Sequence, residues 1–339
     1  MGNSAAVAKS RAVYGSFLKK EDYDILMNKS SIGAAVAYLR TKPRYAAAFA
    51  DVDEAAVHRE QVEELISKSV FDNYIRICKF SGGNRKGIAR FHIKKLEAQQ
   101  LSKAVIAVST GNQAGFYGNL PYYLMDYLSF NPAEAAEAKS FSALLEVLKD
   151  TGYYKFLKPV MSGEKADVNE IIIAINACYM KWAFNEINSG VKGRAKEQLK
   201  SFFLRKADID NLLLCYRLRT FFGKEPEEIK SMLSPYHYRL RPAEIDEALK
   251  SQSPDTAIRE LFLKKKLAEN ISRREDCPEI AVNAADFRYF RRRLALSTNE
   301  IEALYSLMVL AELEAANLFR IIEGIRYGLS SEEIEKFIV

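Results

Sequence analysis

The clearest pattern of hydrophobic and polar positions lies near the C-terminal end of the chain. Apolar residues recur there at steps of three and four, which is the spacing of one face of an α-helix. The stripe consists of Ile301, Leu304, Met308, Ala311, Ala315, Leu318, Ile322 and Ile325, and the glutamates off the stripe are Glu300, Glu302, Glu312 and Glu323. We therefore predict one long amphipathic helix. Gly328 marks its end, and Ser330 with Glu333 predicts a capping box that starts a short helix.

A second copy of this pattern occurs around residue 210, where "ADIDNLLLCYRLRTFFGKEPEEI" lines up with "AELEAANLFRIIEGIRYGLSSEEI". Both copies place a carboxylate three residues before an asparagine, and later a glycine followed by Glu-Glu-Ile. The matched residues are Asp208 and Glu314, Asn211 and Asn317, Gly223 and Gly328, Glu227 and Glu332, Glu228 and Glu333, and Ile229 and Ile334. A fainter third copy contains Glu97, Gln100 and Gly111. It lacks the acidic helix start, and its segment 105–108 could also be a strand.

A shorter helical pattern precedes these long helices. It runs from Ser31 to Leu39 with Thr41 and Tyr45, recurs at Ser140, Leu148, Thr151 and Tyr153, and returns loosely at Ser253 and Leu261. The markers Gln100, Asn211 and Asn317 are separated by 111 and 106 positions, which is too long for an ordinary solenoid repeat. We predict three similar helical bundles around a pseudo-threefold axis, at residues 1–111, 112–223 and 224–339.

Composition supports an all-α fold and describes a mixed surface. Only 16 Gly and 9 Pro punctuate 339 residues of which 48% are hydrophobic, which favours long helices joined by short loops. The net charge of +6 is the balance of 50 basic and 44 acidic side chains, mostly interspersed, so nucleic-acid binding is not implied.

The residues that carry chemistry are sparse. The four cysteines and three histidines are Cys78, Cys178, Cys215, Cys277, His58, His92 and His237. Their spacing predicts neither a disulfide framework nor a metal site, and there is no G-x-S-x-G turn. We expect no cofactor, metal or catalytic residue, and the thiols fit a reducing, cytoplasmic compartment as small core hydrophobes. The most apolar window, from Ile171, is too short to span a bilayer.

One glycine-rich stretch, "KFSGGNRKGIAR", raises the possibility of a phosphate-binding loop. Gly82 and Gly87 have the separation of a P-loop, but Ile88 and Ala89 follow where Lys and Ser or Thr are needed. The stretch therefore predicts a turn between two helices.

Taken together, the motifs resemble one known family. The opening "FLKKEDYDILMNKSSIGAAVAYLRTKPRY", the central "DIDNLLLCYRLRTFFGKEPEEI" and the terminal "EAANLFRIIEGIRYGLSSEEI" are similar to the C subunit of V-type ATP synthases, called subunit d in the vacuolar pump. Each motif alone is weak, but their order, spacing and end-to-end coverage make the match specific. Gln100 in place of asparagine and the eroded first junction are departures from the pattern.

The resemblance implies a mechanism without chemistry. In that family the subunit is a funnel-shaped helical socket on the cytoplasmic face of the membrane proteolipid ring. It receives the lower end of the central shaft, made of subunits D and F, and transmits torque between ATP turnover and ion transport. No nucleic acid and no small-molecule substrate is implied.

The matched carboxylates Glu97, Asp208 and Glu314 could be taken for metal ligands, but they belong to separate copies of the repeat, whereas ligands must converge on one point. We interpret them as structural, with carboxylate and amide hydrogen-bonding backbone groups of neighbouring segments. The junctions at Gly223 and Gly328 are either well-capped turns or partner-docking surfaces. Their candidate docking residues are Gly223, Glu227, Glu228, Gly328, Glu332 and Glu333.

A nucleic-acid-binding or scaffold protein is the alternative. It is motivated by "FRYFRRRLAL", where four arginines, Arg288, Arg291, Arg292 and Arg293, mix with Phe287, Tyr289 and Phe290. Basic and aromatic side chains together can grip phosphates and stack on bases. Asp286, directly before the segment, and the lack of a recognised motif weigh against it.

Overall fold

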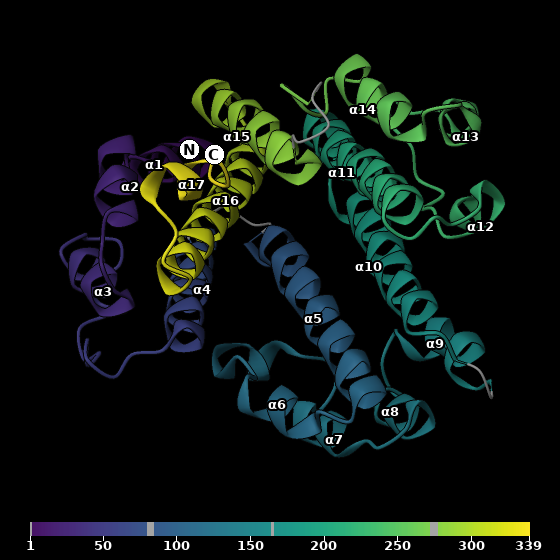
Figure 1. Ribbon diagram of the computed structural model, residues 1–339, viewed down its shortest axis with the longest axis horizontal. Helices are drawn as coiled ribbons and strands as arrows, with labels where there is room; N and C mark the ends of the chain where they lie inside the picture. The colour runs from purple at the N-terminus through teal and green to yellow at the C-terminus, as the bar shows by residue number, and fades with distance from the viewer. Residues whose placement is uncertain (1, 80–84, 164–165, 272–276) are drawn as a thin grey trace. The chain divides into compact units, whose positions relative to one another are not determined.

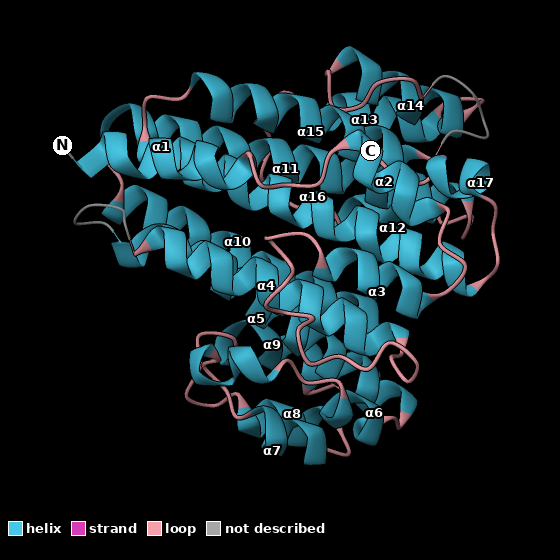
Figure 2. Cartoon of the chain, turned by 90° about the vertical axis from the view of Figure 1, so that its left-hand side faces the viewer, coloured by secondary structure: helices cyan, strands magenta, loops and turns pink. Residues whose placement is uncertain are grey.

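A computed structural model describes residues 2–79, 85–163, 166–271 and 277–339. All regular elements in these ranges are helices (Figure 2), so the all-α prediction is confirmed. The alternative of a strand at 105–108 is wrong, because one helix, α5 (Arg85–Thr110), runs through it. The predicted turn at Gly82 lies outside the described residues.

The chain divides into two compact units, one formed by residues 1–85 and 204–339 and the other by residues 86–203. We call them unit 1 and unit 2. Both α5 and α11 (Gly193–Thr220) cross a boundary between units. The other elements of unit 2 are α6 (Gln113–Gly118), the 3-10 helix η1 (Tyr122–Tyr127), α7 (Pro132–Glu137), α8 (Phe141–Val147), α9 (Tyr154–Met161) and α10 (Val168–Gly190), of which Figure 1 labels the α-helices.

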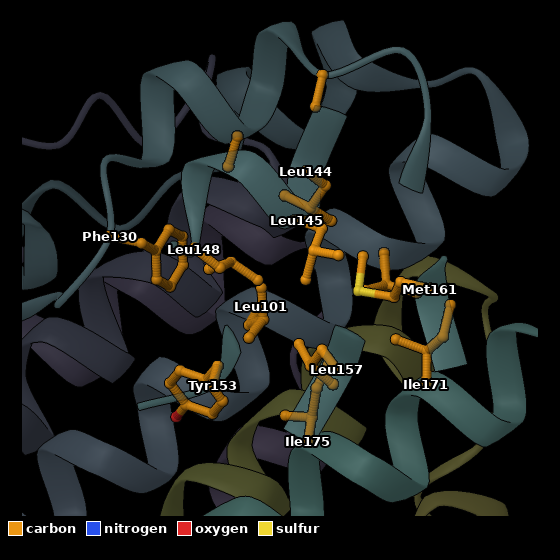
Figure 3. Packing of buried hydrophobic residues seen from close by; sticks show 14 of the residues in the cluster. Leu101, Phe130, Leu144, Leu145, Leu148, Tyr153, Leu157, Met161, Ile171 and Ile175 are labelled. Carbon is orange, nitrogen blue, oxygen red and sulfur yellow. The ribbon is translucent and has the colours of Figure 1, made fainter. Parts of the chain in front are cut away.

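One large apolar cluster of unit 2 is drawn in Figure 3. Leu101 of α5 faces Leu144, Leu145 and Leu148 of the α8 region and Leu157 of α9 there, and further members come from α10. Aromatic rings join the long helices nearby, with Phe91 of α5 lying 5.3 Å from Trp182 of α10 and 5.4 Å from Phe203 of α11 between ring centroids. The short helices α8 and α9 therefore share an apolar core with the long helices α5 and α10.

Unit 1 contains the chain's first and last helices. Its elements besides α11 are α1 (Gly2–Tyr14), α2 (Lys20–Met27), α3 (Ile32–Arg40), α4 (Arg59–Cys78), α12 (Pro226–Ser231), α13 (Pro242–Lys250), α14 (Pro254–Lys264), α15 (Pro278–Leu296), α16 (Glu300–Arg326) and α17 (Ser331–Glu335). Its described residues include two apolar clusters. One joins α2, α3 and α4 to α16 and α17, and the other joins α11 to α13, α14 and α15.

The long helix predicted near the C-terminus is α16, and its burial is more complete than the stripe implies. α1, α4 and α15 all pack on it, so its surface is covered on several sides. Glu302, expected off the apolar stripe, is 5% exposed and lies 3.1 Å from Arg293 of α15. The apolar stripe alone therefore underestimates how much of this helix is buried.

The predicted helix starts and stops are found where capping chemistry places them. Ser330 and Glu333 form the predicted capping box of α17, with the Glu333 carboxylate accepting from the Ser330 N–H at 2.8 Å. Ser31 and Ser140 cap α3 and α8 through their hydroxyls. Cys78, Cys178 and Cys215 are buried as expected, whereas Cys277 is exposed, because it stands just before the first residue of α15.

Each of these described clusters joins one of the three longest described helices to other helices near it: α5 in unit 2, and α11 and α16 separately in unit 1. The boundaries 1–111, 112–223 and 224–339 and the pseudo-threefold axis stay predictions.

Candidate functional site

The six polar residues matched by the repeat are all buried, and all lie on the three longest described helices. Glu97 and Gln100 are on α5, Asp208 and Asn211 on α11, and Glu314 and Asn317 on α16, each at most 5% exposed. A buried carboxylate is costly unless hydrogen bonds or charges compensate it. The partners of each carboxylate therefore define what it does.

Glu314 is held by three groups from the N-terminal part of the chain. Its Oε2 accepts from the Leu18 N–H at 3.0 Å, and its Oε1 accepts from the Tyr45 hydroxyl at 2.5 Å and lies 2.7 Å from Arg44 Nε. The Arg44 guanidinium also covers the Phe17 ring at 4.0 Å. Burial raises the pKa of Glu314, and Arg44 opposes that rise. The carboxylate ties α16 to the chain on both sides of α2 and α3.

Asn317, one turn further along α16, binds a single backbone position. Its Nδ2 donates to the carbonyl of Val339 at 2.6 Å, and its Oδ1 accepts from the Val339 N–H at 3.1 Å. A primary amide matches a peptide group in this way because it carries a donor and an acceptor side by side. The segment after α17 is thereby fixed on α16.

Asp208 and Asn211 do the same work on α11 with different partners. Asp208 accepts from three successive backbone N–H groups, those of Tyr238, Arg239 and Leu240, at 3.0, 2.7 and 3.2 Å. Asn211 binds the backbone of Ser234, donating to its carbonyl at 3.1 Å and accepting from its N–H at 2.8 Å. The whole segment between α12 and α13 is fixed on α11.

The third copy of the repeat, on α5, makes fewer backbone hydrogen bonds than the other two, and its sequence also matches the repeat less closely. Glu97 accepts from the backbone N–H of Ser129 at 2.7 Å and from the Ser129 hydroxyl, and its Oε2 lies 2.5 Å from Lys94 Nζ. Burial, followed by the nearby Glu97 charge, raises the pKa of Tyr153. Among the described residues, Gln100 Oε1 has no hydrogen-bond partner. The longer amide therefore does not reproduce the paired bonds of the asparagines.

Hydrogen bonds compensate these carboxylates, together with an ion pair to Lys94 at Glu97 and to Arg44 at Glu314. An ionised carboxylate that accepts backbone N–H bonds makes strong, charge-assisted contacts, and its oxygens are then occupied. Within the described ranges, no group of three or more His, Cys, Asp or Glu side chains could hold a metal ion. The role of the three sites is structural, because each holds a segment distant in sequence against a long helix. We call them the carboxylate clamps.

The three junction glycines share one backbone conformation. Gly111, Gly223 and Gly328 have φ of 70°, 59° and 66°, in the left-handed region that a side chain disfavours. Each follows the end of a long helix, and the next N–H returns to a helix carbonyl, as at Leu329 N to Gly324 O at 3.0 Å. This is the usual glycine C-cap.

The junction glutamates are exposed, but they differ in how far their charges are compensated. Glu227 pairs with Lys230 at 2.8 Å and with Lys250 at 3.4 Å, and Glu228 pairs with Lys224. Glu333 is engaged in the capping box, whereas Glu332 makes no ion pair among the described residues. Ile229 and Ile334 beside them are buried. Each junction thus combines one buried isoleucine with exposed glutamates beside it.

The arginine-rich segment of α15 is engaged within unit 1. Arg288 pairs with Glu269 and Arg293 with Glu302, and the guanidinium of Arg293 lies over the Tyr289 ring at 5.1 Å. Phe290 is buried against Tyr305. The Phe290 ring is therefore unavailable to stack on bases, and this together with the ion pairs of Arg288 and Arg293 weighs against the nucleic-acid alternative.

The partners of Glu314 were not found from the sequence. The sequence pattern includes Tyr45 as a repeated position but assigns no role to Arg44. Arg11 of α1 was also missed, and it donates to the carbonyls of Leu294, Ala295 and Ser297 at 3.1, 2.8 and 2.7 Å. It thereby caps the C-terminal end of α15, whose last carbonyls lack helical partners.

Comparison with known families agrees with this architecture. The family model described as ATP synthase (C/AC39) subunit matches residues 6–337, nearly the whole chain. The chain therefore belongs to the ATP synthase (C/AC39) subunit family, and it is a subunit of a V-type ATPase. A search of curated proteins returned no significant match. In the part of the chain that the structure describes, no helix is long and apolar enough to cross a membrane.

Proposed function

We propose that this chain is a non-catalytic rotor subunit that couples the D–F shaft to the membrane proteolipid ring on the cytoplasmic face. The observation that carries the proposal is the family match over residues 6–337. In this role the chain carries torque for ATP-linked proton or sodium transport and has no reaction of its own.

The carboxylate clamps support a mechanical role. A torque-bearing part must not let its segments slide past one another, and backbone groups pinned by buried carboxylates resist such sliding. Glu314 joins residues 296 positions apart at Leu18, and Asp208 fixes a loop about 30 residues away at Tyr238. We further propose that the three clamped cores are the three modules of a pseudo-threefold socket.

We also propose that the acidic junctions dock a partner. Glu332 is the better candidate, because Glu227 is already compensated by two lysines. The alternative is that the junctions are only capping devices.

The experiment is co-expression with the D and F subunits of the same complex, followed by a pull-down. We expect the wild-type chain to retain both subunits, and the Glu227→Lys, Glu332→Lys double variant to bind the shaft or the ring more weakly while staying folded. Glu332→Lys alone is the cleaner variant, since Glu227→Lys also places a third cation beside Lys230 and Lys250.

Glu146→Lys is the matched control. Glu146 lies on α8 and its side chain is 64% exposed, so the substitution makes the same charge change at a surface outside the junctions. If the folded double variant binds both partners as tightly as wild type at low and moderate salt, the junctions are capping devices and docking lies elsewhere. If wild type retains neither subunit, the rotor role itself is wrong.

A further inference from the structure

Each carboxylate clamp holds a backbone N–H group just before the first helix of a pair of short helices. These N–H groups belong to Ser129 before α7, Leu240 before α13 and Leu18 before α2. On α5 and α11 the clamped residue follows its carboxylate by 32 positions, whereas on α16 it precedes its carboxylate by 296. The N-terminal part of the chain thus takes the place on α16 that a following segment takes on the other two helices.

The correspondence continues to the end of the second short helix. A buried residue follows that helix in each copy: Tyr153 after α8, Leu267 after α14 and Tyr45 after α3, which are 3%, 1% and 0% exposed. Tyr45 also returns to the clamp, because its hydroxyl donates to Glu314 at 2.5 Å. Residues 18–45 thus correspond to residues 129–153 and 240–267. We call residues 18–45 the strap.

The amide beside each carboxylate shows how the strap differs from its counterpart on α11. On α11 the amide and the carboxylate hold two points of one continuous loop, at Ser234 and Tyr238. On α16 the amide holds Val339 and the carboxylate holds Leu18, which come from opposite ends of the described chain. Non-covalent contacts therefore bring the strap to α16 at the point where the copy on α11 has a continuous backbone.

Polar contacts hold the two short helices of the strap together. The Asp22 carboxylate of α2 accepts from the Tyr38 hydroxyl of α3 at 2.8 Å and lies 2.6 Å from Lys42 Nζ. Both helices also bury apolar residues in one cluster, among them Leu26 and Leu39. Since the two helices are joined to each other, we expect them to detach from α16 together.

The N-terminal side of the strap is anchored only by α1. This helix packs on α4, α15 and α16, and Arg11 donates to three carbonyls at the end of α15. Along the chain α1 leads from the strap to no further described helix. A detached segment that is tethered at one end gains more conformational entropy than one tethered at both ends.

We propose that the strap, anchored by α1, is a reversible closure of unit 1 that opens as one piece while α11 and its short helices stay folded. Cooperative opening of part of a fold is common where a segment can leave without unfolding the rest. Opening of the strap exposes Glu314 and the apolar residues Ala315 and Leu318 of α16, which lie in the same cluster as α2 and α3. The inference does not rest on the rotor role, because every contact that carries it lies within unit 1.

The test is hydrogen exchange of the purified full chain in water, followed by mass spectrometry. The comparison is between α3 and α14, the second short helix of each copy in unit 1, whose residues Leu39 and Phe262 are both 0% exposed. We expect the amides of α2 and α3 to exchange with one common opening, and about tenfold or more faster than those of α14.

Arg11→Met loosens the anchor without changing the strap itself. It removes three hydrogen bonds between α1 and the end of α15, so exchange in α2 and α3 should rise about threefold to tenfold while α14 stays unchanged. The matched control is Arg90→Met, which removes an exposed ion pair to Glu186 in unit 2 and should leave the strap unchanged. Circular dichroism verifies folding, and Tyr45→Phe, which removes the hydroxyl bound to Glu314, replaces Arg11→Met if that variant does not fold.

Three results would overturn the inference. Exchange of α2 and α3 that is no faster than that of α14 in wild type means that the strap does not open separately. Different openings for α2 and α3 mean that it does not open as one piece. If Arg11→Met speeds exchange only in α1 and at the end of α15, α1 is not the anchor. The pull-down with D and F tests the rotor role separately, so either proposal can fail while the other holds.

Discussion

Glu314 and Asp208 occupy the same position of the repeat, at the same depth, yet they fasten their segments with different donors. Glu314 faces a guanidinium, a phenol and one backbone N–H, from Arg44, Tyr45 and Leu18. Asp208 faces three backbone N–H groups. The position of the carboxylate and its task are therefore repeated, whereas the partners are not. Removing the Glu314 carboxylate leaves the buried Arg44 cation without its partner. Removing the Asp208 carboxylate leaves only neutral backbone N–H groups without theirs.

The largest effect is expected for Glu314→Ala. The Arg44 side chain is 2% exposed, and an unpaired buried charge costs about 3–5 kcal/mol. Urea unfolding should show this loss, while Glu332→Ala, an exposed glutamate, should leave stability unchanged. Adding Arg44→Met should recover part of the loss. A loss no larger than that of Asp208→Ala would mean that the Arg44 charge contributes nothing to the difference between the clamps.

A smaller loss is expected for Asp208→Ala. Three N–H groups lose their acceptor, and unsatisfied groups cost about 1–3 kcal/mol when water cannot replace the bond fully. Two of these N–H groups belong to the exposed residues Tyr238 and Arg239, so water relieves part of the cost. Thermal unfolding measures the change, and an unmoved melting temperature would make the clamp a surface feature.

The two amides Asn317 and Gln100 should also differ in how much their removal lowers the free energy of unfolding. Asn317→Ala breaks two bonds to Val339, at about 1–2 kcal/mol, whereas Gln100→Ala removes an amide whose Oε1 is unpaired and should cost clearly less. Parallel denaturant titrations of the two variants give the comparison. Equal losses would show that burial of the amide, not its pairing, matters.

The smallest expected effect is a pH dependence of the stability that Glu314 contributes. Burial raises the folded-state pKa of Glu314 above 4.5, so the folded protein holds this proton more tightly than the unfolded chain does. Its contribution to stability is complete below the unfolded pKa and is lost as pH rises through the folded one. The free energy of unfolding of wild type minus that of Glu314→Gln should therefore fall as pH rises upward from about 4.5. If this difference in unfolding free energy rises with pH instead, the folded-state pKa of Glu314 is lowered and not raised.

The comparison also explains what the sequence could and could not predict. Helices, caps and glycine ends depend on residues a few positions apart, so Ser330 with Glu333 and the left-handed Gly111 follow from local pattern. The partners of Glu314 lie 269 and 296 positions away at Tyr45 and Leu18, and no local rule pairs them.

The measurement that tests the central claim most directly is reconstitution. The rotary complex, stripped of this chain and placed in vesicles, would be assayed for ATP hydrolysis and ion transport before and after the purified chain is added back. The account predicts that the chain alone hydrolyses no ATP and that its addition restores transport driven by hydrolysis. Transport that is fully coupled to hydrolysis without the chain would contradict the account.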